Sequence, residues 1–345
     1  MIVGLDCRLV NKIQNTGISR YTEFLLEYYQ TRKDITKIVL ILNEKIYDHE
    51  YGEISLTKLK PYNILHFVLF KSYVESLQID VLHSPFYSSF IIKPKNLVSI
   101  LTVHDLMYKI VPSFFSKNKY ISTLKRWYFD FIVENSIKNS DILISVSETT
   151  RRDILSFYKR DSLCIPEDSE INDEIPTVTL DRFLLQDKPY FFYCGNNRPH
   201  KNLDFVREVF ERSDDLPLLV LAGKGHKSGK NILAVGNVTD EELSVLYRGA
   251  VSFIFPSFYE GFGLPILEAI KLRTKIVASN IPAFMEFKSN NIIFFEINNV
   301  QSFRAALIEA QGRSFFNDEE FLNGYSKEHI YELNDRMFSK IDNLL

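Results

Sequence analysis

The feature that most constrains the fold of this chain is the alternation of short apolar runs with longer stretches of helical periodicity. Near-continuous apolar strands that alternate with helices are typical of a parallel sheet covered on both faces. In the first half of the chain, strands are predicted at residues 1–5, 37–42, 63–68, 79–83, 97–103 and 141–146. Helices are predicted at 18–31, 119–139 and 148–158, and Ser147 is expected to cap the last of them.

The alternation stops at residues 166–188 and then begins again. This segment contains PEDSEINDEIP, which is acidic and aperiodic, so a linker between two domains is predicted there. Further strands are predicted at 190–194, 217–222, 232–236, 251–255, 275–279 and 291–295, and further helices at 202–213, 240–249, 264–272 and 300–311. A length of 345 residues agrees with two domains of about 150 residues each. We therefore predict two doubly wound α/β domains that face a cleft, with ligands beyond the carboxyl ends of the strands.

Charge and cysteine content exclude several classes of function. Lys and Arg number 41 against 44 Asp and Glu, a net charge of −3, so no overall basic field favours nucleic acid. The three cysteines are too few and too scattered for a disulfide framework or a zinc site. No apolar run approaches the ~18 residues of a spanning helix. The chain starts MIVGLDCRLV, in which the apolar run before Asp6 is too short for the core of a signal peptide. A cytoplasmic protein is expected.

The strongest chemical signal is PSFYEGFGLPILEA at residues 256–269, which follows a predicted strand and opens a predicted helix. Gly261 and Gly263 allow the backbone to approach a ligand closely. A helix start binds phosphate through its unpaired N–H groups and the helix dipole. Glu260 precedes the helix and Glu268 lies within it, so the two carboxylates can address different parts of one ligand. A turn with two surface glutamates is the alternative.

Two further segments follow predicted strands. In GNNRPHKNL, Arg198 and Lys201 lie beside Gly195 and suit a diphosphate, the Arg as a planar fork and the Lys as a mobile point charge. In LTVHDL, His104 lies at the carboxyl end of a strand, where an imidazole can donate to a sugar hydroxyl or polarise a reacting centre. A solvated basic loop and a structural histidine are the respective alternatives.

A fourth segment, NTGISRY at residues 15–21, lies between the first strand and its helix. Gly17 would allow close contact with a ligand at this point, although a plain loop-to-helix junction explains the segment equally well.

These segments together resemble glycosyltransferase family 4, the retaining, nucleotide-sugar-dependent enzymes with the GT-B fold, in which two Rossmann-like domains face a central cleft. The matching motifs are D-x-R (6–8), T-G-I-x-R-Y (16–21), V-H-D-L (103–106), V-S-E-x-T-R-x-D-I (146–154), R-P-x-K-N (198–202) and P-S-x-x-E-G-F-G-L-P-x-L-E-A (256–269). They are most similar to the branch that builds bacterial surface polysaccharides, such as the O-antigen of lipopolysaccharide, often with mannose or rhamnose.

The resemblance implies a division of labour between the two domains. Residues 1–165 would form the acceptor-side domain, with a C-terminal helix at 328–345 packing back on it, and residues 189–327 would bind the donor. No metal or other cofactor is implied. The co-substrate would be a nucleoside-diphosphate sugar such as GDP-mannose, and the acceptor a surface glycan or a lipid-linked oligosaccharide.

The resemblance also implies roles for the candidate catalytic residues. Arg198 and Lys201 would hold the donor diphosphate, and Glu260 the hydroxyls of the transferred sugar. His104 would lie beside the reactive face of that sugar, and Glu268 would bind the nucleotide ribose. The other implied donor-binding residues are Gly17, Asn196, Val238, Ser257, Gly261, Phe262, Gly263 and Leu264.

The chain departs from the family pattern at three places and leaves two other protein classes open. The departures are His200, where many relatives have a second basic residue, and residues 164–167 and 272–275. The alternative classes are a catalytically silent GT-B-like protein that binds nucleotide sugar or acts as a scaffold, and another enzyme of activated sugars, such as an epimerase or phosphorylase. GKGHKSGKN at 223–231 fails the spacing of a P-loop, so an exposed basic loop is expected there.

The segment FFSKNKYISTLKRWYFDFIV, residues 114–133, has two interpretations. It combines Lys119, Lys125 and Arg126 with Trp127 and several Phe and Tyr residues. A basic aromatic helix can lie in a lipid headgroup layer, which would place the protein at the inner face of the cytoplasmic membrane. The interpretation that we favour from the sequence is a cleft-facing helix whose aromatic side chains belong to the core.

Overall fold

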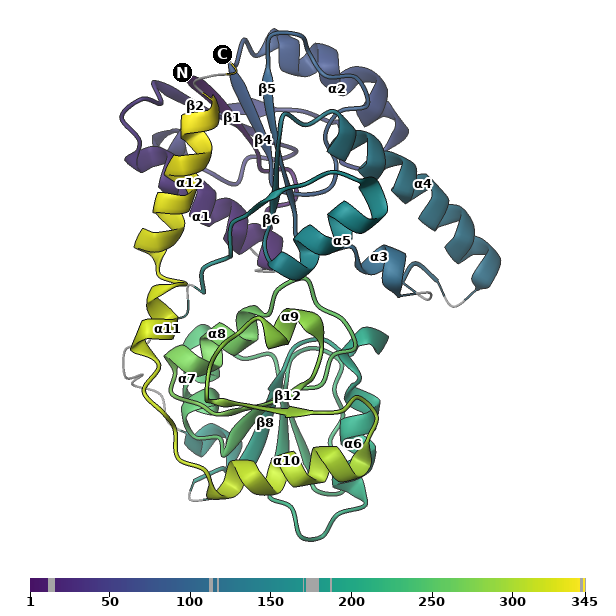
Figure 1. Ribbon diagram of the computed structural model, residues 1–345, viewed down its shortest axis with the longest axis vertical. Helices are drawn as coiled ribbons and strands as arrows, with labels where there is room; N and C mark the ends of the chain where they lie inside the picture. The colour runs from purple at the N-terminus through teal and green to yellow at the C-terminus, as the bar shows by residue number, and fades with distance from the viewer. Residues whose placement is uncertain are drawn as a thin grey trace. The chain divides into compact units, whose positions relative to one another are not determined.

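The computed structural model describes residues 1–11, 16–111, 114–116, 118–169, 171, 180–186, 188–341 and 344. Of the segments singled out above, Asn15, Lys117, part of the predicted linker (residues 170, 172–179 and 187) and residues 342, 343 and 345 of the predicted C-terminal helix lie outside the described residues. The chain forms two compact units (Figure 1). Unit 1 comprises Met1–Asp168 and Lys327–Leu345, and unit 2 comprises Ser169–Ser326.

The described residues of unit 1 contain a seven-stranded parallel sheet in the order β3-β2-β1-β4-β5-β6-β7. Its strands are β1 (Ile2–Asp6), β2 (Lys37–Leu42), β3 (Glu53–Leu56), β4 (Val81–Ser84), β5 (Val98–Val103), β6 (Ile142–Ser145) and β7 (Leu163–Cys164). Its helices are α1 (Gly17–Thr31), α2 (Ile64–Ser76), α3 (Met107–Ile110), α4 (Lys119–Lys138), α5 (Glu148–Tyr158), α12 (Lys327–Ile341) and the short 3₁₀ helix η1 (His49–Tyr51).

Both faces of this sheet are covered. Successive residues of a strand point to opposite faces of the sheet, so the packing of one strand shows what covers each face. Leu40 and Leu42 of β2 pack in one cluster with residues of α1 and α12. Val39 and Ile41 of the same strand pack in another cluster with α2. The capping prediction at α5 is confirmed, since the Ser147 hydroxyl accepts a hydrogen bond from the backbone N–H of Thr150 at 2.9 Å.

The described residues of unit 2 contain a six-stranded parallel sheet in the order β10-β9-β8-β11-β12-β13. Its strands are β8 (Tyr190–Cys194), β9 (Leu218–Ala222), β10 (Ile232–Gly236), β11 (Ser252–Phe255), β12 (Ile276–Ser279) and β13 (Ile292–Phe295). Its α-helices are α6 (Leu203–Glu211), α7 (Asp240–Arg248), α8 (Leu264–Lys271), α9 (Pro282–Met285), α10 (Val300–Gly312) and α11 (Glu319–Asn323). Two 3₁₀ helices, η2 (Leu180–Phe183) and η3 (Pro199–Lys201), precede α6.

Helices cover both faces of the second sheet as well. Phe191 and Tyr193 of β8 pack with α6 and α10, whereas Phe192 lies edge-on to Tyr247 of α7 at 5.1 Å between ring centroids. Leu185, in the second half of the predicted linker, is only 1% exposed and belongs to unit 2. This part of the linker therefore packs as part of unit 2. The predicted doubly wound α/β architecture is confirmed in each unit.

One predicted strand is wrong. Residues 63–68 were expected to form a strand, but they begin helix α2, which Asn63 caps by accepting from the N–H of Leu65 at 3.0 Å. The helix buries His66, Phe70 and Val74, four residues apart, and so follows helical periodicity. The edge strand of the sheet, next to β2, is instead β3, which is half-exposed and was not predicted from the sequence.

The favoured interpretation of residues 114–133 is wrong for several of its aromatic side chains. Phe129 does pack inward, 4.8 Å from the ring of Tyr108. Tyr120, Trp127 and Phe131, however, are exposed on α4 rather than part of the core.

Candidate active site

The candidate site in unit 2 lies where the order of its strands reverses. The chain leaves β8 toward β9 and β10 and then returns to form β11 on the other side of β8. Doubly wound sheets bind ligands beyond the carboxyl ends of the strands at such a switch point. Residues 195–203 follow β8 and residues 256–269 follow β11, so the two strongest sequence segments both start at this position.

Lys201 and Glu260 meet at this switch point. The ammonium group of Lys201 donates to Glu260 Oε1 at 2.7 Å, and the side chains are only 17% and 14% exposed. The fold thus joins two candidate catalytic residues that are 59 positions apart in the sequence. Because an ammonium group carries three N–H donors, two of them remain for an anion beside the pair.

Neighbouring groups fix the position of this ion pair. The hydroxyl of Ser257 donates to the same Oε1 of Glu260 at 2.6 Å. The Lys201 ammonium lies 5.1 Å from the ring centroid of Phe255, within the range of a cation–π contact. The backbone N–H of Phe258 donates to the carbonyl of His200 at 2.8 Å, which ties the two loops together. The pair is therefore held by both loops.

The glycine-flanked start of α8 is shaped by packing inside unit 2. Gly263 has φ 149° and ψ 46°, a conformation that L-residues rarely adopt. A Cβ atom there would lie 2.9 Å from the ring of Phe287 and 3.4 Å from that of Phe284. Gly261 and Phe262 are buried beside it, and Leu264 opens the helix. The side of Gly263 on which a side chain would project is therefore filled by aromatic rings of unit 2.

Glu268 lies on the buried side of α8. It is 6% exposed, and the hydroxyl of Tyr247 donates to its Oε2 at 3.1 Å. Burial, Cys194 and Glu268 together raise the pKa of Tyr247 well above its ordinary value, so this hydroxyl stays protonated and acts as a donor. Glu260 and Glu268 thus have separate surroundings, as their spacing suggested.

The loop after β8 carries one permanent cation besides Lys201. Arg198 is exposed, and its backbone N–H donates to the side chain of Asn196 at 3.1 Å. His200 is buried, and burial, with Lys201 and Arg198 nearby, lowers its pKa to about 4. His200 is therefore neutral at physiological pH and does not replace the second basic residue that many relatives have.

Glycines line the carboxyl ends of the neighbouring strands. Gly195, Gly223 and Gly236 follow or end β8, β9 and β10, and all have positive φ. A Cβ atom on Gly223 would lie 2.1 Å from the carbonyl oxygen of Gly195, so no other residue fits there. The basic loop after Gly223 is exposed at Lys224 and Lys227, as predicted.

Val238 lies just beyond β10, half-buried, next to the start of α7. Thr239 caps this helix in a capping box with Glu242, with hydrogen bonds of 3.2 and 2.9 Å. The loop that holds Val238 is therefore fixed at its helical end.

In unit 1, His104 follows β5 and is held by two acceptors. Its Nδ1 lies 2.5 Å from Glu167 Oε1, and its Nε2 lies 2.9 Å from the carbonyl oxygen of Pro85. Burial lowers the pKa of His104, but Glu167, Pro85 and Asp105 outweigh this effect and raise the pKa above 6.5. Since a carbonyl only accepts, Nε2 carries a proton. The free N–H donor that the sequence predicted for a sugar hydroxyl is thus already in use.

Glu167 is the functional residue that sequence reasoning missed. It lies in the acidic, aperiodic segment assigned to the linker, yet it is 7% exposed and pairs with His104 63 residues away. No local periodicity or motif marks it, and only the place of this segment in the fold distinguishes it from the other acidic residues nearby.

A chain of buried hydrogen bonds runs behind His104. The ring of His104 lies edge-on to Tyr21 at 4.9 Å, and the Tyr21 hydroxyl lies 3.0 Å from that of Thr102. Thr102 lies 2.8 Å from Nε2 of His83, whose Nδ1 lies 2.5 Å from the Tyr29 hydroxyl. Burial, with His104 nearby, lowers the pKa of His83 to about 3, so His83 is neutral at physiological pH.

The D-x-R motif forms a buried bidentate pair. Arg8 donates to both oxygens of Asp6 at 2.7 and 2.6 Å, and both side chains are fully buried. Arg8 also donates to the carbonyl of Leu59 at 2.8 Å and contacts His66 at 3.0 Å. This motif therefore ties the end of β1 to the chain before and within α2.

Gly17 is the first residue of α1. Thr16 caps the helix by accepting from the N–H of Ser19 at 3.2 Å. A Cβ atom on Gly17 would find nothing within 4 Å. Within the part of the chain that the structure describes, the space beside Gly17 is therefore unfilled.

The described residues contain no helix with the length and apolar character that a membrane crossing needs. They also contain no group of three or more His, Cys, Asp or Glu side chains arranged to hold a metal ion.

The structure thus places the candidate residues in two groups. Unit 2 joins Lys201, Glu260 and Ser257 directly and holds Glu268 and Arg198 on elements that follow the same strands. Unit 1 holds His104 and Gly17 beyond β5 and β1. Two Rossmann-like sheets with ionisable side chains at the carboxyl ends of their strands define a protein of the GT-B fold.

Comparisons with known proteins identify the family. A family model described as "Glycosyltransferase Family 4" matches residues 17–165, and one described as "Glycosyl transferases group 1" matches residues 181–311. A solved structure of sucrose-phosphate synthase from Thermosynechococcus elongatus has the same fold, with a TM-score of 0.76 at 16% identity over 100% of both chains. The chain belongs to glycosyltransferase family 4.

Two curated relatives are O-antigen chain mannosyltransferases. RfbU of Salmonella typhimurium is 26% identical over 222 residues, which are 60% of this chain and 59% of that protein. O-antigen chain mannosyltransferase B of Escherichia coli is 26% identical over 241 residues, 61% of each protein. These matches span less than two thirds of the length of either relative.

Proposed function

We propose that this chain is a retaining glycosyltransferase that moves a hexose, mannose or a rhamnose-like sugar, from a nucleoside-diphosphate sugar to a surface glycan or lipid-linked oligosaccharide. The single observation that carries the proposal is the Lys201–Glu260 ion pair of 2.7 Å at the β8–β11 switch point. It brings together a cation suited to a diphosphate and a carboxylate suited to sugar hydroxyls, at the position where such sheets bind ligands.

The chemistry of this pair suits the leaving group. As the bond between sugar and diphosphate breaks, negative charge grows on the diphosphate, and preorganised donors stabilise that charge. Lys201 keeps two N–H donors beyond the one given to Glu260. Arg198, exposed on the same loop, adds a planar fork for a second phosphate oxygen. In this proposal these cations stabilise the diphosphate without a metal.

The remaining residues of the proposed donor site have roles that follow the family resemblance. Glu260 contacts hydroxyls of the sugar, and Glu268, fixed by Tyr247, binds the ribose. His104 is proposed to lie beside the reactive face of the sugar, and Glu167 Oε1, 2.5 Å from its Nδ1, raises its pKa and so favours the protonated ring. By the same resemblance, the backbone around residues 261–264 and the residues Asn196, Val238, Ser257 and Gly17 are proposed to complete the donor site.

The choice of sugar and the cellular place rest on the relatives. The two curated relatives are described as O-antigen chain mannosyltransferases, so mannose is the first donor sugar to test. Retention of configuration follows from the family. A position at the cytoplasmic face of the membrane would give such an enzyme access to a lipid-linked acceptor.

The first test is a donor screen followed by transfer. GDP-, UDP- and dTDP-sugars are compared for their effect on the thermal unfolding midpoint, since a ligand that binds only the folded chain stabilises it by about 2.7 kcal/mol at 100 times its dissociation constant. With the best donor, we expect Lys201→Ala and Glu260→Gln each to lower kcat/KM by about 100-fold or more, the usual cost of one preorganised electrostatic contact.

Arg212→Ala is the matched control. It also removes the cation of an ion pair in unit 2, with Glu208 at 2.8 Å, but on the exposed end of α6. We expect it to leave transfer unchanged. Near-normal turnover in Lys201→Ala, with folding intact, would exclude the proposed site. Donor binding without any transfer or hydrolysis would instead favour the silent scaffold, and a changed donor without an acceptor product would favour another enzyme of activated sugars.

A further inference from the structure

The first half of α4 presents an apolar face that unit 1 does not cover. Tyr120, Leu124 and Trp127 are 89%, 69% and 73% exposed and lie at i, i+4 and i+7 on one helix face. Between Lys119 and Phe131 only Ser122 is buried, whereas the second half of the helix packs on the core through Ile132, Val133, Ser136 and Ile137. The helix therefore extends an apolar surface away from the core.

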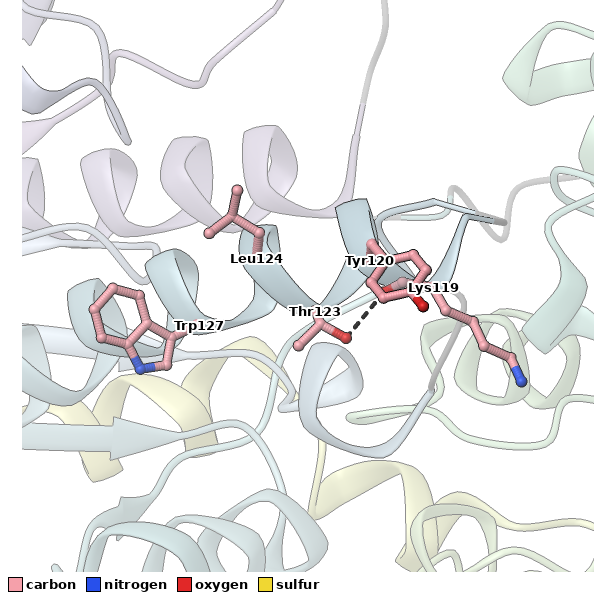
Figure 2. A pocket seen from close by; sticks show the side chains of 5 residues that line it. All are labelled: Lys119, Tyr120, Thr123, Leu124 and Trp127. Atoms are coloured by element: carbon pink, nitrogen blue, oxygen red, sulfur yellow. Dashed lines mark hydrogen bonds between the residues drawn. The ribbon is translucent and has the colours of Figure 1, made fainter.

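Figure 2 shows how these side chains are arranged. Tyr120, Leu124 and Trp127 line one shallow groove along α4 together with Lys119 and Thr123. The hydroxyl of Thr123 turns back to the carbonyl of Lys119 at 2.9 Å, so it does not compete for a ligand. The groove thus offers apolar rings and one ammonium group.

Helix α2 of unit 1 also begins with an exposed apolar ridge. Ile64, Leu65 and Val68 in its first turns are all more than half exposed. The chain just before them touches α4, where the Tyr128 hydroxyl donates to the carbonyl of Tyr62 at 2.8 Å. These two ridges, Ile64, Leu65 and Val68 with Tyr120, Leu124 and Trp127, are named the α2–α4 surface.

The two segments of the chain that carry the α2–α4 surface contain basic residues but no acidic ones. Residues 54–74 and 106–129 contain no Asp or Glu, in a chain whose net charge is −3. The same segments contain eight basic residues, Lys58, Lys60, Lys71, Lys109, Lys117, Lys119, Lys125 and Arg126. Lys58, Lys60, Lys119 and Lys125 are exposed. Two of the eight pair with acidic residues outside these segments, Lys71 with Glu75 and Lys109 with Asp130. Exposed apolar side chains beside the four exposed lysines suit an anionic layer that has an apolar interior.

We propose that the α2–α4 surface binds the face of an anionic lipid bilayer. Trp127 and Tyr120 lie at the headgroup level, where amphipathic aromatic rings are favoured. Leu124, Ile64, Leu65 and Val68 enter the acyl boundary, and the lysines contact anionic headgroups. The biological purpose of this contact rests on the transfer proposed above, since a lipid-linked acceptor lies at a bilayer. The contact itself depends on unit 1 alone.

The chain contains a built-in probe for this contact, because Trp127 is its only tryptophan. The full chain, without donor or acceptor, is mixed with vesicles of phosphatidylcholine alone or with phosphatidylglycerol added. With the anionic vesicles we expect co-sedimentation, a blue shift of Trp127 emission and its quenching by brominated acyl chains. With phosphatidylcholine alone, and in high salt, we expect binding to fall strongly.

Matched variants separate the two contributions to binding. Each basic residue near an anionic surface strengthens binding about fivefold, so Lys119→Glu with Lys125→Glu should weaken it at least about 25-fold. Arg212→Glu with Lys230→Glu makes the same charge change on exposed residues of unit 2 and should bind normally. Tyr120→Ser with Leu124→Ser should abolish the blue shift, whereas Leu184→Ser with Ile308→Ser, exposed in unit 2, should retain it.

Several outcomes would overturn the proposal. Unchanged Trp127 emission with anionic vesicles would exclude this surface as the site of contact, even if the protein sedimented. Equal weakening by the two charge-reversed pairs would show nonspecific attraction. A blue-shifted Trp127 without lipid, in a particle with the mass of two chains, would show that a second copy covers the surface. None of these results depends on transfer activity. A failure of the membrane proposal therefore does not bear on the proposed donor site, which the transfer assay tests separately.

Discussion

At the scale of single residues, His104 shows how the fold decides what a motif can do. The sequence suggested an imidazole with an N–H free for a sugar hydroxyl, but Glu167 and the carbonyl of Pro85 engage both nitrogens. The ring is therefore held in a fixed orientation in which its protonated form is favoured. The raised pKa means that the pair stabilises the fold fully below pH 6.5 and loses this contribution as the pH rises through the raised value.

Glu167 is the positioning residue for this cation, and we expect Glu167→Gln to lower the pKa of His104. Without the Glu167 carboxylate, only Pro85 and Asp105 oppose the effect of burial, and burial disfavours the charged form. The measurement is an NMR titration of His104, with the other histidines as internal references. In the transfer assay, the alkaline limb of the pH profile should move to lower pH.

Asp168→Asn is the control for this substitution, because it removes a neighbouring carboxylate that no hydrogen bond joins to the His104 ring in the described residues. It should leave the titration of His104 unchanged. If His104 titrates alike in Glu167→Gln and in the unaltered chain, the carboxylate does not hold the proton and the positioning role is wrong.

At the scale of helices and strands, most strands of the two parallel sheets were predicted from the sequence. Strands such as β2 and β8 match the predicted residues 37–42 and 190–194 because buried parallel strands are continuous apolar runs with clear ends. The edge strand β3 was missed because it is short and half-exposed. Residues 63–68 were mistaken for a strand because a short apolar run fits both periods.

The candidate site was predictable only in parts. The motifs marked Lys201 and Glu260 separately, but their contact depends on β11 returning to lie beside β8, and no local pattern contains that information. Glu167 carried no local signal at all. The motif glycine Gly263 was marked correctly as special, yet its reason lies in Phe284 and Phe287, which are about 20 residues further along the chain.

The glycines that open α1 and α8 are expected to respond oppositely to alanine. Gly263→Ala should lower the free energy of unfolding by about 1–3 kcal/mol or more, because of its positive φ and its contact with Phe287. Gly17→Ala should leave it unchanged or raise it by up to about 1 kcal/mol, since the site is helical and open. Chemical denaturation of the two variants measures this difference.

The same pair separates packing from ligand contact. If Gly17→Ala keeps its stability but loses transfer, the added methyl group occupies space that the ligand needs. Equal losses of stability in the two variants would contradict the conclusion that the backbone of Gly263, but not that of Gly17, requires a glycine.

At the scale of the whole molecule, unit 1 is built from two separate parts of the chain. Its sheet comes from residues before 169, but α12 comes from the C-terminal end. Ile330, Met337, Phe338 and Ile341 of α12 are buried in the cluster that also contains Leu40 and Leu42 of the sheet. The core of unit 1 is therefore complete only when the last segment of the chain has docked.

Phe338 is the residue through which this dependence can be measured. Its ring lies 5.6 Å from that of Tyr29, and the Arg32 guanidinium lies 4.3 Å above it. Phe338→Ala should destabilise unit 1 by about 3–5 kcal/mol, as truncation of a buried Phe does. Ile308→Ala on the exposed face of α10 is the control and should change little. Native-state hydrogen exchange should show lost protection in residues 1–168, while residues 190–312 keep theirs. Equal loss in both ranges would mean that the two units unfold as one, and the separate core assigned to unit 1 would then be wrong.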